Sequence, residues 1–377
     1  MSIGEPNERK QRRNKIDFLE IFNKFRKDGN FQSVGKILGK GSFGEVREII
    51  YKNKVMAGKI VMQDNRDKSG EYIAYDLKGK NIIKINKIVE KEIDNQYYYL
   101  IIMEKAVLRD LGKLTEFYHN HNLLKLINEP FDEITSNSLL RFYARQILNA
   151  LELLNRNHFV HFDLKPENLL ISINLIIKLS DFSLLKKIED KDKIKIPGGT
   201  NGYVSLEYYK RDQKISGEDA RKQDFFSFGA TLYFLKYGKH MLKYKKLEDN
   251  ESYILTILEK LQTEISRIRA DIFADKEFID FLVSLIWYTP DARPNFEQIY
   301  RNKWINKDLQ QLNDTYSFFE YDEENIIIEL QKQDFLIEKE NEKQERNKYQ
   351  NMKQLKKFKF KKNNEKIRRF KQNQNFE

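Results

Sequence analysis

The sequence predicts an α+β fold in which the strands come first and the helices follow. Two apolar stretches flank a cluster of glycines between residues 34 and 46, which predicts a strand, a tight turn and a second strand. Three more apolar stretches of strand length follow at residues 54–61, 82–89 and 97–103. From residue 138 to residue 154 the apolar side chains instead recur at the spacing of a buried helix. Strands segregated from helices are typical of the α+β class.

The composition excludes several classes of protein. The chain has 377 residues, 40% of them hydrophobic, and can therefore bury a large core. It contains no Cys, which excludes disulfides, thiolate zinc sites and a cysteine nucleophile. Its longest apolar run, residues 97–103, is far shorter than the roughly 18 residues of a membrane span, and residues 1–15 lack the apolar core of a secretory signal. We expect an intracellular protein, cytoplasmic or nuclear, without a transmembrane segment.

The net charge of +11 belongs mainly to the two ends of the chain. Residues 340–377 carry 13 Lys/Arg and 5 Asp/Glu, a balance of +8, and residues 1–34 carry 8 and 5, a balance of +3. The chain between them is close to neutral. The C-terminal charge run fits an acidic protein, nucleic acid or an anionic membrane, and the alternative is a solvated helix or coil without a partner.

Residues 1–32 read as a polar lead with a short amphipathic piece at residues 16–22. The pattern G-x-G-x-x-G-x-V follows at Gly39, Gly41, Gly44 and Val46, and backbone N–H groups in such a glycine turn can face a phosphate. A plain hairpin turn is the alternative.

In the next strand, Lys59 stands among apolar residues, where a buried ammonium needs an anionic partner. The alternative is a Lys that faces solvent.

The stretch from His161 to Leu170 carries the chemistry of the chain. Asp163 can accept a hydroxyl proton, Lys165 can neutralise phosphate oxygens, and Asn168 can hold a metal ion. A small hairpin at residues 169–179 then leads to Asp181, whose carboxylate would join Asn168 as a hard oxygen ligand for Mg²⁺.

These motifs, in this order, resemble those of protein kinases. His161 to Asn168 resembles the catalytic loop H-R-D-x-x-x-x-N, with Phe162 in place of Arg, and residues 181–183 resemble D-F-G, with Ser183 in place of Gly. Residues 198–207 resemble the substrate-docking loop and the A-P-E end of the activation segment. Residues 223–229 resemble the buried D-x-W-S-x-G start of a helix, and Arg293 resembles the Arg that pairs with the acid at 207. The resemblance covers residues 33–305.

The resemblance implies a two-lobed protein kinase fold, with a small β-rich N-lobe over residues 33–103, a large helical C-lobe over residues 107–305, and a Lys/Asn-rich tail over residues 306–377 that is partly helical or disordered. It also implies ATP and Mg²⁺ as cofactors and transfer of the γ-phosphate to a protein Ser or Thr hydroxyl in signalling. Lys165, two residues after Asp163, is the mark of serine/threonine specificity.

The same resemblance assigns roles to individual residues. Asp163 and Lys165 would be catalytic, Asn168 and Asp181 would hold the metal, and Glu71 would pair with Lys59. Backbone groups of Glu104 and Ala106 would bind the adenine edge, and Asp110 would reach the ribose, unless it is only a polar exit from a strand. The implied nucleotide contacts are Leu38, Gly39, Gly41, Ser42, Phe43, Gly44, Val46, Ala57, Lys59, Glu104, Ala106 and Asp110.

The departures from the family pattern lead to a further expectation and to a rival. Phe162 cannot bind a loop phosphate, and residues 184–199 contain no Ser, Thr or Tyr to carry one, so we expect activity without activation-loop phosphorylation. Thr200 should bond near Asp163 and Lys165, and alternating Lys and acidic residues could order the loop by local ion pairs. The rival is a pseudokinase that binds nucleotide or partners as a scaffold with little transfer activity. A small-molecule kinase fits less well, because residues 198–207 resemble a peptide-docking loop.

Overall fold

The computed structural model describes residues 17–41, 44–63, 70–106, 110–121, 133–172, 175–209, 214–242 and 251–307. The chain divides into two units, residues 1–319 and 320–377. The second unit lies outside the described residues. So does the expected C-terminal tail from residue 308 onward, in which residues 325–336 could form an amphipathic helix. Ser42 and Phe43 of the glycine loop also lie outside them.

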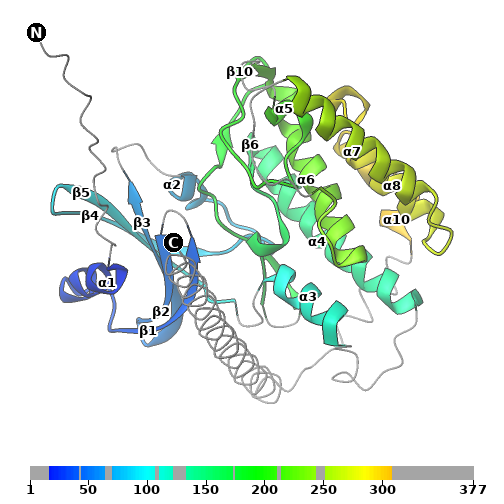
Figure 1. Ribbon diagram of the computed structural model, residues 1–377. Coiled ribbons are helices and arrows are strands. Elements are labelled where there is room, and N and C mark those ends of the chain that lie inside the picture. The colour runs from blue at the N-terminus through cyan, green and yellow to red at the C-terminus, as the bar shows by residue number, and fades with distance from the viewer. Residues whose placement is uncertain are drawn as a thin grey trace, which may run out of the picture. The chain divides into compact units, whose positions relative to one another are not determined.

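The N-terminal lobe is built on one five-stranded antiparallel sheet, as predicted (Figure 1). Its strands stand in the order β1-β2-β3-β5-β4. The strands are β1 (Ser33–Gly41), β2 (Gly44–Tyr51), β3 (Lys54–Gln63), β4 (Ile85–Ile93) and β5 (Gln96–Met103). At the end of the first hairpin Gly41 pairs with Gly44, and an added Cβ at Gly44 would lie 2.0 Å from the Ile60 carbonyl oxygen, so only glycine fits there.

The two faces of this sheet belong to two different cores. Successive residues of a strand point to opposite faces, and β5 follows this rule. Leu100 and Ile102 join a small outer core, whereas Ile101 and Met103 join the main core shared with the helical lobe. The second face therefore packs toward the helical lobe.

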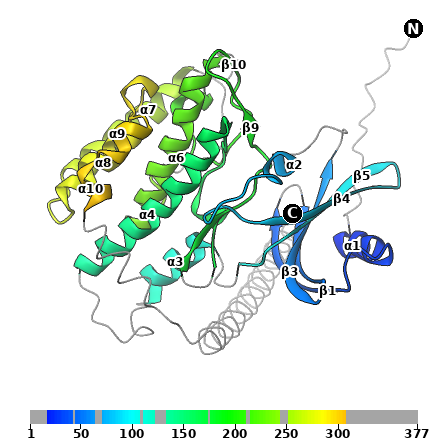
Figure 2. The ribbon, with the colours of Figure 1, turned by 180° about the vertical axis from the view of Figure 1, so that it is seen from behind.

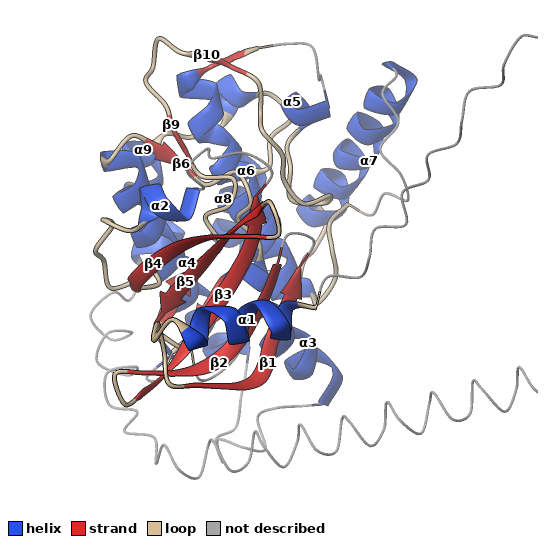
Figure 3. Cartoon of the chain, turned by 90° about the vertical axis from the view of Figure 1, so that its left-hand side faces the viewer, coloured by secondary structure: helices blue, strands red, loops and turns tan. Residues whose placement is uncertain are grey.

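A helix covers the outer face. Helix α1 (Phe18–Lys27) lies across the strands, as Figure 3 shows, and its N-terminus is capped by the Asp17 carboxylate. Phe22 and Phe25 are fully buried against the apolar residues of the sheet. Residues 18–31 were expected in a polar lead with a short amphipathic piece at residues 16–22, but they contribute to the core of the lobe. The amphipathic piece is the first part of α1, whose buried residues Ile21, Phe22 and Phe25 stand at helical spacing.

The larger lobe is helical, as predicted. Its helices are α3 (Leu111–His121), α4 (Glu133–Arg156), α5 (Leu206–Tyr209), α6 (Gly217–Tyr237), α7 (Glu251–Arg269), α8 (Lys276–Leu285), α9 (Phe296–Tyr300) and α10 (Lys303–Asn306). The predicted apolar face of α4 is buried, with Ile147 and Leu148 at the centre of the main core. None of the helices in the described ranges is long and apolar enough to cross a membrane.

Helix α6 begins earlier than the sequence motif suggests. The stretch Gln223 to Gly229 was expected at the start of a helix, but α6 begins at Gly217 because the Ser216 hydroxyl accepts a hydrogen bond from the Asp219 amide at 3.1 Å and caps it. The stretch therefore lies within the helix and is buried there. This places the Asp224 carboxylate beneath the loop that follows β6 (Phe159–Val160).

Three short antiparallel pairs organise the loops of the helical lobe. Strand β7 (Leu169–Ile171) pairs with β8 (Ile177–Leu179), which confirms the predicted hairpin. Strand β6 pairs with β9 (Lys186–Lys187), and β10 (Lys193–Ile194) pairs with β11 (Ile215–Ser216). The last two pairs join the segment between residues 186 and 194 to the body of the lobe.

A buried ion pair holds the end of the docking loop, as the sequence predicted. Arg293 donates to both carboxylate oxygens of Glu207, at 2.9 and 3.1 Å. It also donates to the backbone carbonyl oxygen of Trp287 at 2.8 Å. Its side chain is fully buried, and a buried charge with this many partners is tolerated, whereas the loss of Glu207 would leave it unpaired.

Candidate active site

The loop after β6 is positioned by a buried carboxylate. Asp224 accepts hydrogen bonds from the backbone amides of His161 (2.8 Å) and Phe162 (3.0 Å). Phe162 adopts a positive φ of 64°, which is strained for a residue with a side chain, and these bonds hold it there. Burial raises the pKa of Asp224 above its ordinary value, although both amides and His161 favour its charged form.

His161 is a structural residue that joins two loops. It is fully buried, and its Nδ1 lies 3.2 Å from the backbone amide of Asp163, from which it accepts a hydrogen bond. Its Nε2 lies 3.1 Å from the carbonyl oxygen of Ser180, to which it then donates. The ring also contacts Phe182 edge-on, with centroids 5.6 Å apart. His161 thus joins the two loops that carry Asp163 and Asp181.

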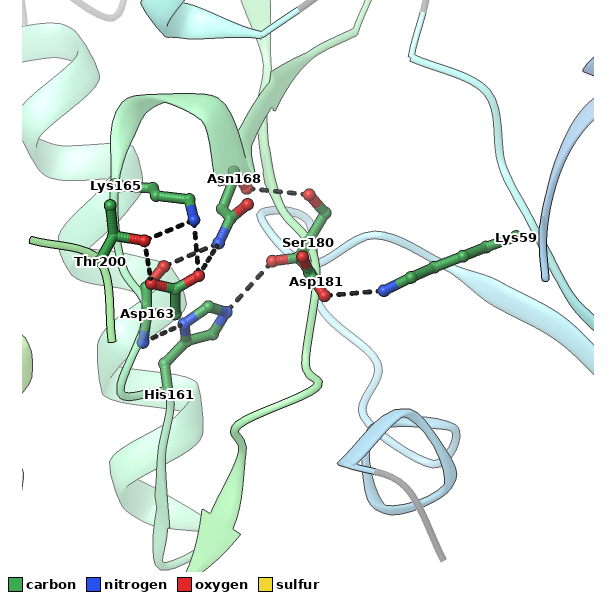
Figure 4. A network of polar contacts seen from close by, with 8 residues as sticks. All are labelled: Lys59, His161, Asp163, Lys165, Asn168, Ser180, Asp181 and Thr200. Carbon is green, nitrogen blue, oxygen red and sulfur yellow. Dashed lines mark hydrogen bonds and ion pairs between the residues drawn. The ribbon is translucent and has the colours of Figure 1, made fainter. Parts of the chain in front are cut away.

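The side chains of Lys165, Thr200 and Asn168 contact Asp163 (Figure 4). The Lys165 ammonium lies 2.7 Å from Asp163 Oδ2, and the Thr200 hydroxyl donates to Oδ1 at 2.6 Å. Lys165 also donates to the Thr200 hydroxyl at 2.6 Å, so Thr200 lies where the sequence predicted it. Asn168 donates through its amide nitrogen to the backbone carbonyl of Asp163 at 2.7 Å. Both oxygens of the carboxylate are thereby fixed in position.

Lys59 joins the two lobes. Its ammonium lies 2.7 Å from Glu71 Oε1 in the N-lobe and 2.7 Å from Asp181 Oδ1 in the helical lobe. Burial alone would lower the pKa of Lys59, but the two carboxylates outweigh this effect and hold the pKa above its usual range. The structure therefore places Lys59 with the partner expected for it.

The position of Glu71 depends on a close backbone approach. Glu71 is the second residue of α2 (Gly70–Ala74), a helix of one turn. An added Cβ at Gly70 would lie 1.8 Å from the carbonyl oxygen of Phe182, so α2 reaches the Asp181 loop only because residue 70 is glycine. Sequence reasoning missed Gly70, since a glycine at a helix start carries no signal of what it contacts.

Asp181 and Asn168 present the oxygens that a divalent cation needs. Burial would raise the pKa of Asp181, but the Lys59 ammonium outweighs it, with help from His161 and the Ser183 hydroxyl, and lowers the pKa to about 2. Asp181 is therefore ionised at neutral pH. Because Asn168 donates through its amide nitrogen, its side-chain oxygen remains available as an acceptor. Ser180 donates to the Asn168 backbone carbonyl at 2.9 Å and keeps the two residues adjacent. This donor set fits Mg²⁺ carried by phosphates.

The predicted nucleotide contacts on the sheet lie on its inner face. Ala57 and Met103 are buried in the main core, and Leu38 and Val46 pack against it. Met103 ends β5, after which Glu104 and Ala106 continue without regular structure. An added Cβ at Gly39 would meet nothing within 4 Å, so the first glycine borders open space.

Two predicted binding residues have other partners in the structure. Asp110 Oδ1 accepts a hydrogen bond from the Lys113 amide at 2.8 Å, and its Oδ2 pairs with the Lys113 ammonium at 3.1 Å. Its side chain is therefore engaged at the start of α3, and contact with a ribose remains a prediction. The Glu104 carboxylate accepts from the Lys84 amide at 2.8 Å and pairs with Lys178 at 3.0 Å, which fixes the segment after β5.

The segment between Asp181 and Thr200 is anchored by apolar packing. Phe162 is fully buried in a cluster with Val160, Ile188, Ile196 and Ala220. Strand pairing adds to this through β6–β9 and β10–β11, and Figure 2 shows this part of the chain beside α6. Neither pairing has a recognisable sequence signal, because strands of two residues carry no periodicity.

The docking loop has one further contact that sequence reasoning did not find. The Tyr203 hydroxyl lies 3.1 Å from Nδ1 of His240, which follows α6. Burial raises the pKa of Tyr203, and the negative charges of Glu167 and Glu116 raise it further. Glu116 belongs to α3, and Glu167 stands beside Asn168 in the catalytic loop.

Comparison with known proteins agrees with this geometry. The chain is similar to human serine/threonine-protein kinase MRCK alpha, with 27% identity over 231 residues that make up 60% of this chain and 13% of that protein. It is 30% identical to calcium-dependent protein kinase 4 of Plasmodium berghei over 294 residues, 72% of this chain and 48% of the relative. It is 26% identical to the Aurora kinase of Schizosaccharomyces pombe over 287 residues, 73% and 71% of the two chains.

The chain spans about one eighth of the length of the first relatives that it matches, the MRCK kinases, of which 13% is covered. The family model described as protein kinase domain matches residues 32–305. Its matched region contains the five-stranded sheet, the helical lobe and the cluster around Asp163 and Lys59. The chain therefore belongs to the protein kinase domain family.

Proposed function

We propose that this chain is an active serine/threonine protein kinase that uses ATP and Mg²⁺. The observation that carries the proposal is the complete pair of clusters, Lys59 with Glu71 and Asp181 on one side, and Asp163 with Lys165 and Thr200 on the other. No catalytic side chain of the motifs is missing, and the departures at Phe162 and Ser183 leave Lys59, Asp163, Asn168 and Asp181 in place. The serine/threonine kinases to which the chain is similar support the choice of acceptor.

The geometry supports a defined role for each catalytic side chain. The hydroxyl oxygen of a substrate Ser or Thr forms a bond to the γ-phosphorus as the bond to the bridging oxygen breaks, and ADP leaves with that electron pair. Asp163, whose carboxylate is fixed by Lys165 and Thr200, orients the hydroxyl and takes its proton. Lys165 balances the charge of the transferred group, because its ammonium lies beside Asp163.

The nucleotide and metal contacts follow from the second cluster. Lys59 would bind the phosphates, Glu71 would hold Lys59 in place, and Asn168 and Asp181 would bind Mg²⁺. The bound cation supplies charge neutralisation on the phosphates. Asp181 meets this requirement because its low pKa keeps it ionised. Glycine-loop residues Gly39 to Val46 would cover the phosphates.

The test is transfer of radioactive phosphate from ATP to a degenerate set of Ser/Thr peptides. The wild-type chain should transfer phosphate, and Asp163→Ala should lower kcat by at least about 100-fold, the size of a general-base contribution, while its affinity for ATP stays within a few-fold. If the wild-type chain binds ATP but transfers no more phosphate than Asp163→Ala does, the chain is a pseudokinase scaffold, the alternative suggested by Phe162 and Ser183.

We also infer that activity does not require phosphate on the activation segment. The supporting observation is the burial of Phe162 with Ile188 and Ile196. These apolar contacts order the activation segment, which in phosphorylation-dependent relatives is ordered by an ion pair between a phosphate and an Arg. The Thr200 hydroxyl is engaged by Asp163 and Lys165 and is not free to carry phosphate. Protein made in a bacterial host and treated with phosphatase should retain full activity. Activity that disappears with phosphatase and returns with phosphate on residues 184–200 would refute this.

A further inference from the structure

We propose that the activation segment selects substrates with acidic residues on one side of the phosphorylated Ser or Thr. The proposal rests on the proposed kinase activity and names its substrate class. The recognising groups are the ammonium groups of Lys186, Lys187, Lys191, Lys193 and Lys195. We call these five residues the lysine segment.

The lysine side chains are exposed because the neighbouring isoleucines pack into the cluster around Phe162. Ile194 and Ile196 pack toward Phe162, and side chains alternate along an extended chain, so Lys193 and Lys195 point to solvent. Ile188 is buried in the same cluster, whereas Lys186 and Lys187 are exposed in β9. The apolar anchoring of the segment thus fixes the direction of its charges.

The acidic residues between the lysines do not neutralise them. Sequence reasoning allowed local ion pairs, but Asp190 pairs with Arg221 of α6, and Glu189 Oε2 lies 3.1 Å from Nδ1 of His158. Asp192 accepts a hydrogen bond from the Glu189 backbone amide at 2.7 Å. Within the described part of the chain, none of the five lysines has an ion-pair partner. The segment therefore presents unpaired positive charge although its sequence is mixed.

Both ends of the lysine segment are tied to the catalytic loop. Lys186 pairs with Val160, three residues before Asp163. The other end runs from Lys195 over five residues to Thr200, whose hydroxyl bonds Asp163. We infer that a peptide whose hydroxyl reaches Asp163 passes the ends of the lysine segment, at Lys186 and Lys195, and extends along it. This proximity distinguishes them from the other exposed lysines of the surface.

Negative charge also lies near the docking loop. The exposed Glu167 packs against α3, where an added Cβ at Gly112 would lie 3.6 Å from its Cγ. Its charge and that of Glu116 in α3 raise the pKa of Tyr203 in the docking loop. A nucleic acid, which is negative along its whole length, would meet these carboxylates as well as the lysines. A peptide can place acidic residues beside the lysines alone, so the charge distribution favours a peptide with acidic residues on one side of the acceptor.

The experiment compares peptides that share one Ser and differ in the three residues on either side of it. Each side carries either Glu or its uncharged isostere Gln. The wild-type chain should give kcat/KM roughly fivefold or more higher for the peptide with Glu on the favoured side than for the Gln peptide, the range for several exposed charge pairs. The KM for ATP should not differ between peptides, and the preference should shrink in 0.5 M salt.

Two triple variants separate the lysine segment from general charge. The variant Lys191→Glu, Lys193→Glu and Lys195→Glu should lose the preference for Glu and prefer Lys at the same positions. The control Lys27→Glu, Lys52→Glu and Lys54→Glu changes three exposed lysines of the N-lobe by the same charge and should keep the wild-type preference.

The outcomes distinguish this inference from the proposed function. Equal use of Glu and Gln peptides, a preference that is the same on both sides of Ser, or equal effects of the two triple variants would overturn the acidic substrate class while leaving the kinase activity established. If single-stranded RNA competes with every peptide and the lysine-segment variant abolishes that competition without changing peptide preference, the surface binds nucleic acid and the inference is wrong. Transfer to none of the peptides would overturn the proposed function itself.

Discussion

The buried ammonium of Lys59 is neutralised by the carboxylates of Glu71 and Asp181, and the buried Glu71 is in turn neutralised by Lys59. Glu71 is 2% exposed, and its Oε2 has no hydrogen-bond partner among the described residues. Removal of the ammonium would leave a buried carboxylate without a counter-charge. The ion pair is thus required for local stability as well as for the proposed binding of phosphate.

We therefore predict that Lys59→Met abolishes transfer and lowers the free energy of unfolding by about 3 kcal/mol, the cost of breaking a buried pair. The double variant Lys59→Met with Glu71→Gln should recover part of that stability and none of the activity. Urea denaturation and peptide phosphorylation measure the two effects. If Lys59→Met is as stable as wild type, the buried pair is not a stabilising interaction. If it is active, Lys59 is not at the nucleotide site.

Asp181 gives a prediction about pH. Its folded-state pKa of about 2 lies below the value of about 3.9 in an unfolded chain. Its contribution to stability is therefore complete above about pH 4 and is lost as the pH falls toward 2. From pH 8 to pH 5 the difference in Tm between wild type and Asp181→Asn should stay constant. A difference that changes by several degrees within this range would mean that Asp181 titrates there and that Lys59 does not hold it ionised.

At the scale of elements, the one-turn helix α2 is held in place by its contacts with other parts of the chain rather than by its own hydrogen bonds. It has five residues, and an isolated helix of this length is not stable in water. Its first residue, Gly70, touches the Phe182 backbone, and its second residue pairs with Lys59. Displacement of α2 would therefore separate Glu71 from Lys59.

We predict that Gly70→Ala lowers kcat/KM at least tenfold, because the added Cβ would push α2 away from Phe182. The matched control for stability alone is Gly39→Ala, whose Cβ meets nothing within 4 Å, because Gly39 belongs to the proposed nucleotide site and its activity is not compared. Differential scanning fluorimetry should show a lower Tm for Gly70→Ala alone. If both variants have the wild-type Tm and Gly70→Ala keeps full activity, the close approach of α2 to the Asp181 loop is not needed.

At the scale of the whole molecule, the N-terminal helix decides where the folded lobe begins. The match to the family starts at residue 32, yet Phe22 and Phe25 of α1 are fully buried on the outer sheet face. Burying two aromatic side chains contributes roughly 4 kcal/mol or more to folding. Without α1, Ile60 and Leu100 would be exposed on an open sheet.

We predict that a chain starting at residue 32 aggregates or unfolds at least 10 °C lower than a chain starting at residue 17. Size-exclusion chromatography and thermal denaturation report the two effects. The variant Phe22→Ala in the longer chain should give an intermediate Tm. Equal Tm values for the two truncated chains would mean that α1 does not stabilise the sheet.

The sequence predicted the parts of the molecule that have a strong local pattern. The five strands and helix α4 follow from the apolar periodicity. The group of Lys59, Glu71, Asp163, Lys165, Asn168 and Asp181 follows from the resemblance of its motifs to those of protein kinases, and the structure brings that group together. Gly70, the β10–β11 pair and the partners of Glu189 and Asp190 could not be predicted, because they depend on residues far apart in the sequence that meet only in the folded chain.

The apolar anchoring of the activation segment has a consequence for control in a cell. If the proposed activity needs no phosphate on this segment, the segment that Phe162, Ile188 and Ile196 order would take its active shape when the protein is synthesised. No separate activation step would then limit the proposed enzyme. The rate of phosphorylation would follow the number of copies present, so that transcription, degradation and the arrival of substrate set the output. Changes in gene dosage should change that rate in direct proportion.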